Sequence, residues 1–151
     1  MREQIGMTDN TLVRAGYFYF SPITTRWHDN DLYGHVNNVT YYSYFDTAAN
    51  KYLIEEGGLD IQTAAVVGFV VSSKCQYLAP ITYPDNIDIG FRVNRLGNSS
   101  VEYGLAVFKQ GENFAVAHGS FTHVFVNRAS NKSVPIPASI KSALERVLVV
   151  L

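Results

Sequence analysis

The hydrophobic positions of the chain follow a helical spacing in one segment and alternate in most of the others. Between Asn38 and Glu56, apolar side chains recur at three- and four-residue steps and form one stripe: Tyr41, Phe45, Ala48, Ala49 and Tyr52. This spacing predicts an amphipathic helix of about 18 residues. Asn37 or Asn38 can cap its first turn, and the glycines at 57 and 58 end it. The wide apolar arc indicates burial on more than one side.

Alternating and β-rich runs predict five strands, over residues 17–27, 65–78, 87–96, 101–108 and 114–126. Pro22 places the first strand at an edge of the sheet or at a bulge. Gly97-Asn98-Ser99 predicts a hairpin turn. A short helix is expected from Ala138 to about Val149. The expected order is a strand, the long helix, four strands in a meander and a terminal helix, which is an α+β architecture.

Length and composition narrow the class of protein. A chain of 151 residues predicts one domain over 1–151, with 1–15 as a loose lead-in. The 47% hydrophobic and 17% charged residues exclude a disordered chain. With a net charge of -1, the chain lacks the large excess of basic residues that would bind the phosphates of a nucleic acid. Cys75 is the single cysteine, which excludes a disulfide framework and fits a reducing compartment. With no apolar run of ~18 residues and no signal-peptide pattern, we expect a cytoplasmic protein without a membrane partner.

The candidate chemistry lies between the first strand and the long helix, in the segment 26–38. Asp29 and Asp31 are two residues apart, and Asp31 precedes the first helical turn by about seven residues. The free N–H groups of that turn attract anions. Gly34 allows the chain to bend back toward Asp31. A carboxylate and fixed N–H donors in one small volume suit acyl transfer. The carboxylate acts as base or nucleophile, and the N–H donors stabilise the developing oxyanion.

The same residues allow other interpretations. Both aspartates can serve as turn formers and helix caps, and Asp29 can order the loop by pairing with Arg26. His28, Asp31 and His35 could bind zinc, but no fixed ligand motif is present, so no metal ligand is expected.

The segment Asp31-Leu32-Tyr33-Gly34-His35-Val36-Asn37-Asn38-Val39-Thr40-Tyr41 resembles the active-site signature of the hotdog-fold acyl-CoA thioesterases. The nearest group is the 4-hydroxybenzoyl-CoA thioesterase-like family. Its signature has an Asp, two spacers, a Gly, a variable residue and a Val before a long aromatic helix. The resemblance covers roughly residues 24–137, and the element order is similar. It implies a hotdog fold, in which a five-stranded antiparallel sheet wraps a long central helix, here followed by a short C-terminal helix.

The resemblance also implies a reaction and its catalytic groups. The chain would hydrolyse an acyl-CoA or acyl-carrier-protein thioester to the free acid and thiol, without a cofactor. Asp31 would act as nucleophile or general base. A backbone N–H at the helix start would polarise the thioester carbonyl: Asn38 first, with Val36 and Asn37 as alternatives. His35 would orient water or the substrate carbonyl, or pack against a neighbouring subunit.

The family forms dimers whose sheets join edge to edge with active sites at the subunit interface. A homodimer, or a homotetramer of two dimers, is therefore expected. The expected substrate contacts are Gly34 in the loop, the aromatic residues Trp27, Tyr41, Tyr42, Phe45 and Phe69 around the acyl group, and Arg128 and Lys132 at the CoA phosphates. Some members of the family have basic residues in the hairpin turn that meets the CoA phosphates, but the turn 97–99 of this chain has none. This difference weakens the expectation of a CoA thioester relative to a carrier-protein thioester.

Two other functions remain open from the sequence. One is a binding module that holds an acyl thioester without reacting. The other is an enoyl-thioester hydratase of the same fold. Such hydratases pair an Asp with a His or Asn five positions later, where this chain has Val36.

Overall fold

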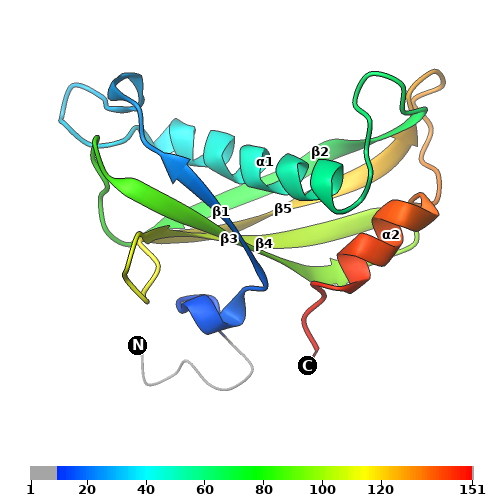
Figure 1. Ribbon diagram of the computed structural model, residues 1–151. Coiled ribbons are helices and arrows are strands. Elements are labelled where there is room, and N and C mark those ends of the chain that lie inside the picture. The colour runs from blue at the N-terminus through cyan, green and yellow to red at the C-terminus, as the bar shows by residue number, and fades with distance from the viewer. Residues whose placement is uncertain (1–9, 151) are drawn as a thin grey trace.

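The computed structural model describes residues 10–150, and one long helix crosses one face of a five-stranded antiparallel sheet (Figure 1). The elements are β1 (Tyr19–Thr24), α1 (Asn38–Glu55), β2 (Val66–Tyr77), β3 (Asn86–Leu96), β4 (Ser100–Lys109), β5 (Ala117–Asn127) and α2 (Ala138–Glu145). The predicted α+β architecture is therefore confirmed. So is the expected hotdog arrangement of a central helix, a wrapping sheet and a short terminal helix. Within residues 10–150, no helix is both long enough and apolar enough to cross a membrane.

The strand order corrects the expected four-strand meander. The sheet runs β1-β3-β4-β5-β2, so only β3, β4 and β5 are consecutive neighbours. β2 pairs with β5 along its length, from Val66 opposite Asn127 to Tyr77 opposite Ala117. The alternation of side chains shows that a segment is a strand, but it does not show which strand is its partner. β1 and β2 are the two edges, and the position of Pro22 in an edge strand is confirmed.

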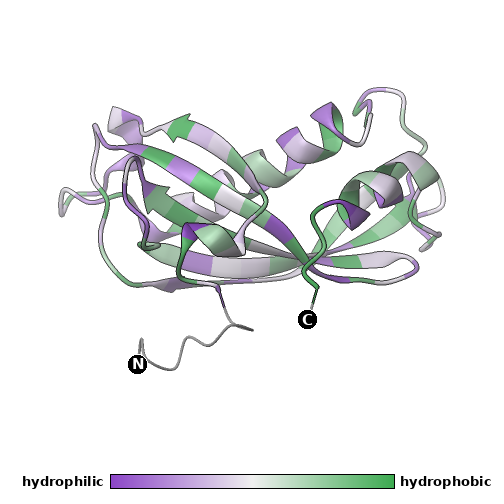
Figure 2. Cartoon of the chain, turned by 60° about the horizontal axis from the view of Figure 1, so that its bottom comes forward, coloured by the Kyte–Doolittle hydropathy of each residue, from purple (hydrophilic) through white to green (hydrophobic). Residues whose placement is uncertain are grey.

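The core lies between α1 and the inner face of the sheet. Every residue of the predicted helical stripe is buried, with at most 3% of its surface exposed. The facing strand positions are equally buried: Ile87, Ile89, Phe91 and Val93 in β3, and Val101, Tyr103, Leu105 and Val107 in β4. Hydrophobic and hydrophilic positions alternate along the strands (Figure 2). Burying each large apolar side chain contributes about 1.5–3 kcal/mol, which fixes α1 on the sheet.

The two ends of α1 follow from its sequence. The Asn37 side chain caps the first turn, its Oδ1 accepting the Val39 N–H at 3.0 Å. Gly58 follows the last turn with φ of +70°, a conformation that favours glycine. The start of α1 is therefore fixed at Asn38, next to the candidate segment.

The expected loose lead-in over 1–15 is not found at residues 10–15, while residues 1–9 lie outside the described part. The Leu12 carbonyl accepts the Ala115 N–H at 3.0 Å. The Arg14 guanidinium pairs with Asp88 at 3.0 Å and lies 5.0 Å from the Phe108 ring centre. These contacts attach the segment to the outer face of the sheet.

Candidate functional site

The loop between β1 and α1 folds back on itself and places Asp31 at its base. Asn30 and Val36 form an isolated antiparallel bridge. Within it, the Asp31 N–H donates to the His35 carbonyl at 2.8 Å, and the Gly34 N–H donates to the Asp31 carbonyl at 3.2 Å. Gly34 has φ of +83°, so the tight return depends on a glycine at this position.

A second loop, at residues 81–83, holds the first in place. The Val36 N–H donates to the Ile81 carbonyl at 2.8 Å. The Thr82 hydroxyl donates to the Gly34 carbonyl at 2.6 Å. Because both contacts bridge segments far apart in the sequence, the loop geometry is set by the fold as well as by its own turns.

The Asp31 carboxylate is oriented by one of its two oxygens. Oδ1 accepts the Tyr33 N–H at 2.8 Å, while Oδ2 makes no hydrogen bond within the described residues. The residue is partly exposed. One oxygen therefore fixes the carboxylate, and the other is available to attack a carbonyl carbon or to accept a proton from water.

Of the three N–H groups considered at the start of the helix, two are already used. The Val36 N–H donates to Ile81, and the Asn37 N–H donates to the Asp29 carbonyl at 2.9 Å. The Asn38 N–H has no acceptor among residues 10–150. In this conformation Val36 and Asn37 cannot serve as the alternative donors, which leaves Asn38 at the positive end of the α1 dipole.

Asp31 and Asn38 border the same pocket, which has a volume of about 420 Å³. Its lining residues are Asp31, Tyr33, His35, Val36, Asn38, Tyr41, Tyr77, Leu78, Ala79 and Pro80. The structure thus brings together five of the residues expected from the sequence: Asp31, His35, Val36, Asn38 and Tyr41. The pocket is of a size that small-molecule groups occupy.

Tyr77 is a part of this site that the sequence did not indicate. Its hydroxyl donates to the Asn38 carbonyl at 3.0 Å, and its ring packs edge-on against Tyr41 with centres 5.0 Å apart. Burial raises the pKa of Tyr41 to about 12 and also raises that of Tyr77, so both phenols are neutral at physiological pH. Asp31 is then the single carboxylate among the lining residues.

Two open depressions adjoin the pocket. A cleft of about 1000 Å³ lies on the other side of the loop, lined by Trp27, His28, Asn30, Asp31, Leu32, Tyr33, Gly34, Asn37 and Thr82. A groove of about 500 Å³ lies between α1 and β2, lined by Val39, Tyr42, Ser43, Asp46, Val70, Ser73 and Phe121. Three expected substrate contacts, Trp27, Gly34 and Tyr42, therefore border open space. Asp31 borders both the pocket and the cleft.

The structure separates the other four expected contacts from Asp31. Phe45 is 1% exposed and belongs to the core, so it lines neither the pocket nor the two depressions. Phe69 is 56% exposed on the edge strand β2. Arg128 and Lys132 follow β5 and lie beside the start of β2, whereas Asn38 contacts Tyr77 at the end of β2. The length of β2, roughly 36 Å, therefore separates the two basic residues from the pocket. Figure 1 shows the loop between β1 and α1 and the loop after β5 at opposite ends of the sheet.

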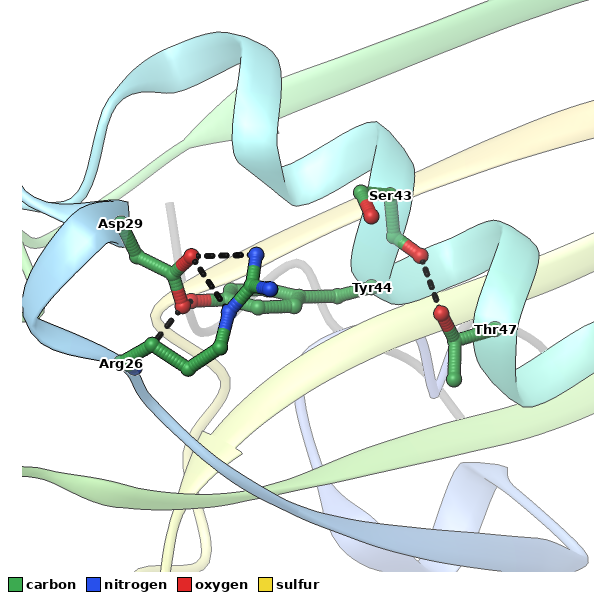
Figure 3. A network of polar contacts seen from close by, with 5 residues as sticks. All are labelled: Arg26, Asp29, Ser43, Tyr44 and Thr47. Atoms are coloured by element: carbon green, nitrogen blue, oxygen red, sulfur yellow. Dashed lines mark hydrogen bonds and ion pairs between the residues drawn. The ribbon is translucent and has the colours of Figure 1, made fainter.

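Asp29 has a structural environment unlike that of Asp31, and its predicted pairing with Arg26 is confirmed. Its carboxylate is 3% exposed and accepts from Arg26 and from the Tyr44 hydroxyl of α1 (Figure 3). Burial alone would raise the pKa of Asp29, but the Arg26 backbone N–H, the Arg26 guanidinium and Tyr44 together lower it. The residue is a buried, fully bonded anion. Tyr44 was not singled out from the sequence, although it lies one turn after Tyr41 on the buried face.

Within the part of the chain that the structure describes, no three His, Cys, Asp or Glu side chains come close enough to bind a metal ion. His28, Asp31 and His35 lie on one loop but do not form a ligand set. The pocket brings together one carboxylate, the backbone amide of Asn38 and the aromatic side chains of Tyr33, Tyr41 and Tyr77.

Comparison with known proteins identifies the family and the structures that the chain resembles. The model of the thioesterase-like superfamily matches residues 25–144. The PA5185 protein from Pseudomonas aeruginosa strain PAO1 is 58% identical with a TM-score of 0.89, covering 90% of this chain and 95% of that one. The PA2801 protein from Pseudomonas aeruginosa is 32% identical, with a TM-score of 0.77 over 84% and 98%. BH1999 gentisyl-coenzyme A thioesterase is 25% identical, with a TM-score of 0.74 over 83% and 99%.

Proposed function

The chain belongs to the thioesterase-like superfamily, which makes it a thioester hydrolase, and we propose that it cleaves an acyl thioester with Asp31 and the Asn38 N–H as its reacting pair. The observation that carries this proposal is the shared pocket of about 420 Å³. Among residues 10–150, Asp31 has a carboxylate oxygen without a hydrogen bond and Asn38 has an amide without an acceptor, and both residues line this pocket. This is the pairing that acyl transfer requires.

In the nucleophilic form of the reaction, Asp31 Oδ2 attacks the thioester carbonyl carbon. The carbonyl oxygen becomes an oxyanion that accepts the Asn38 N–H, a contact worth on the order of 10²–10³ in rate. The carbon–sulfur bond then breaks, and the thiolate leaves and takes a proton from water. Water hydrolyses the resulting anhydride and regenerates the carboxylate.

In the general-base form, Asp31 accepts a proton from water as the water oxygen attacks the same carbon. The geometry of the pocket suits both forms. Rapid quenching followed by mass spectrometry distinguishes them, because only the nucleophilic form leaves an acyl group on the peptide that contains Asp31.

The substrate site is completed, in this proposal, by a second copy of the chain. β2 is a 12-residue edge strand with unpaired backbone groups, and it exposes Phe69, Val70 and Val71. If two β2 strands pair antiparallel, the start of one lies beside the end of the other. The loop of a second copy that carries Arg128 and Lys132 would then reach the Asp31 pocket. That arrangement supplies cations for a CoA or carrier-protein phosphate from residues that are remote within one chain.

The test is thiol release from a panel of short, long and aromatic acyl-CoA thioesters. We expect turnover by the native protein and a loss of at least about 10²-fold in Asp31→Asn. Asp60→Asn, an exposed aspartate in the loop after α1, is the matched control and should turn over normally. Undiminished turnover in Asp31→Asn would reject the assignment of Asp31.

The alternatives predict different products. A non-catalytic binding module would bind acyl-CoA tightly and release no thiol. An enoyl-thioester hydratase would add water to a crotonyl thioester without releasing thiol. The buried side chain of Val36, at the position where such hydratases carry a polar residue, does not favour the second alternative.

A further inference from the structure

The carboxylate of Asp29 joins the loop between β1 and α1 to the helix beside the proposed active site. Its Oδ1 accepts from the Arg26 guanidinium, from Nε at 3.1 Å and from Nη2 at 2.9 Å. Its Oδ2 accepts the Arg26 backbone N–H at 2.9 Å and the Tyr44 hydroxyl at 2.8 Å. Figure 3 shows the Tyr44 ring reaching from α1 to this carboxylate. A single buried anion therefore connects the start of the loop, just after β1, to the helix.

The backbone of Asp29 extends the same connection to both reacting groups. Its carbonyl accepts the N–H of Asn37, the residue that precedes Asn38. In the other direction, Asp31 follows two residues later, directly after the Asn30 bridge to Val36. Asp29 is thus two residues from the proposed catalytic carboxylate along the chain, and its carbonyl is hydrogen-bonded to the residue before the proposed oxyanion-binding amide.

From this geometry we propose that Asp29 and Tyr44 are positioning residues, which set the separation between the Asp31 carboxylate and the Asn38 N–H. The inference rests on the proposed function, because it concerns the same two reacting groups. Neither Asp29 nor Tyr44 lines the 420 Å³ pocket, so both act through their neighbours and do not contact the acyl group. A displacement of reacting groups by about 1 Å can cost on the order of 10²-fold in rate.

Tyr44→Phe tests the proposal, since it removes one hydroxyl and keeps the ring. The chain offers a matched control on the same helix: the Tyr52 hydroxyl, also buried, donates to the Ala143 carbonyl of α2, about two turns beyond Tyr44 and further from the site. Tyr44→Phe and Tyr52→Phe should lose comparable stability. Only Tyr44→Phe should lower kcat, by on the order of tenfold, with KM changed by less than about twofold. Asp29→Asn should lower kcat further, because the Arg26 donors then face an amide.

A second readout does not depend on turnover. Hydrogen exchange of the Asn37 amide reports the bond to the Asp29 carbonyl directly. It should be faster in Tyr44→Phe than in Tyr52→Phe.

The outcomes separate the two proposals. Turnover in the native protein, with equal kcat in the two tyrosine variants, would overturn the positioning role and leave the proposed function intact. Absence of turnover in the native protein would reject the proposed function. The exchange rates would then decide the positioning role alone: faster exchange at Asn37 in Tyr44→Phe supports it, and equal rates overturn it.

Discussion

At the scale of single residues, the clearest contrast is between two aspartates that are two positions apart. Among the described residues, the carboxylate of Asp29 accepts four hydrogen bonds and is buried, whereas the carboxylate of Asp31 accepts one and has a second oxygen without a hydrogen bond. The sequence indicated the Arg26–Asp29 pairing because the two residues are three positions apart. It could not show that Tyr44 would complete that site, since this contact depends on how α1 sits on the loop.

His123 provides a prediction at the same scale. Its ring is 3% exposed on β5 and lies 2.9 Å from the Tyr103 hydroxyl through Nδ1. Burial lowers the pKa of His123 from 6.5 to about 4. As the pH falls, His123 therefore binds a proton near pH 6.5 in the unfolded chain but only near pH 4 in the folded chain. The free energy of unfolding should fall as the pH drops through this window, by up to about 3 kcal/mol.

Urea denaturation at pH 7.5 and pH 4.5 measures this loss. His123→Gln should lose about 2 kcal/mol less than the native protein between the two pH values, because it lacks the titrating ring. An unchanged acid loss in His123→Gln would show that the His123 ring does not carry the effect.

At the scale of the elements, α1 was the most predictable part of the fold. Its stripe, its Asn37 cap and its terminating glycines are all local signals, and the structure places the helix at Asn38–Glu55. The sequence did not predict which aromatic residues of the helix line the pocket and which are buried in the core alone. Phe45 packs into the core while Tyr41 reaches the pocket, because the boundary between core and pocket depends on which strand lies beneath each turn.

The position of β2 was predicted least well. Its apolar residues marked a strand, but the chain passes from β2 at one edge to β3 near the other, and no local pattern specifies that path. For the same reason, the sequence did not indicate which distant segments contact the candidate site. Tyr77 contacts Asn38, and Thr82 contacts Gly34 in the β1–α1 loop, each across more than 30 positions of sequence, so no spacing rule could have found them.

The exposed edge of β2 gives a prediction for this element. Val71 is 58% exposed at the bulge in the middle of the strand, between the two ends that a second copy would align. Val71→Lys should leave the monomer folded, since it removes little buried surface, but it should weaken edge-to-edge pairing. Sedimentation velocity should show a shift from dimer to monomer, accompanied by loss of thiol release.

The control for this variant is Val150→Lys, which places the same charge at a 92% exposed position away from the strand edge. It should sediment like the native protein. If Val71→Lys also remains dimeric, the β2 edge is not the interface and the cations of a second copy do not complete the site.

At the scale of the whole molecule, the two ends of the sheet carry different groups of residues. The proposed reacting pair lies in the β1–α1 loop and at the start of α1, and the basic loop of Arg128 and Lys132 lies at the opposite end of the sheet. The sequence could predict both groups of residues, because each belongs to a recognisable segment. It could not predict their separation, which follows from the length and direction of β2.

The most direct test of the account is the structure of the protein bound to an acyl-CoA analogue in which a methylene group replaces the thioester sulfur. The account predicts the analogue's carbonyl oxygen about 2.9 Å from the Asn38 nitrogen, and its carbonyl carbon about 3–3.5 Å from an Asp31 oxygen. An analogue bound elsewhere, or an Asp31 side chain turned away from the carbonyl carbon, would contradict it.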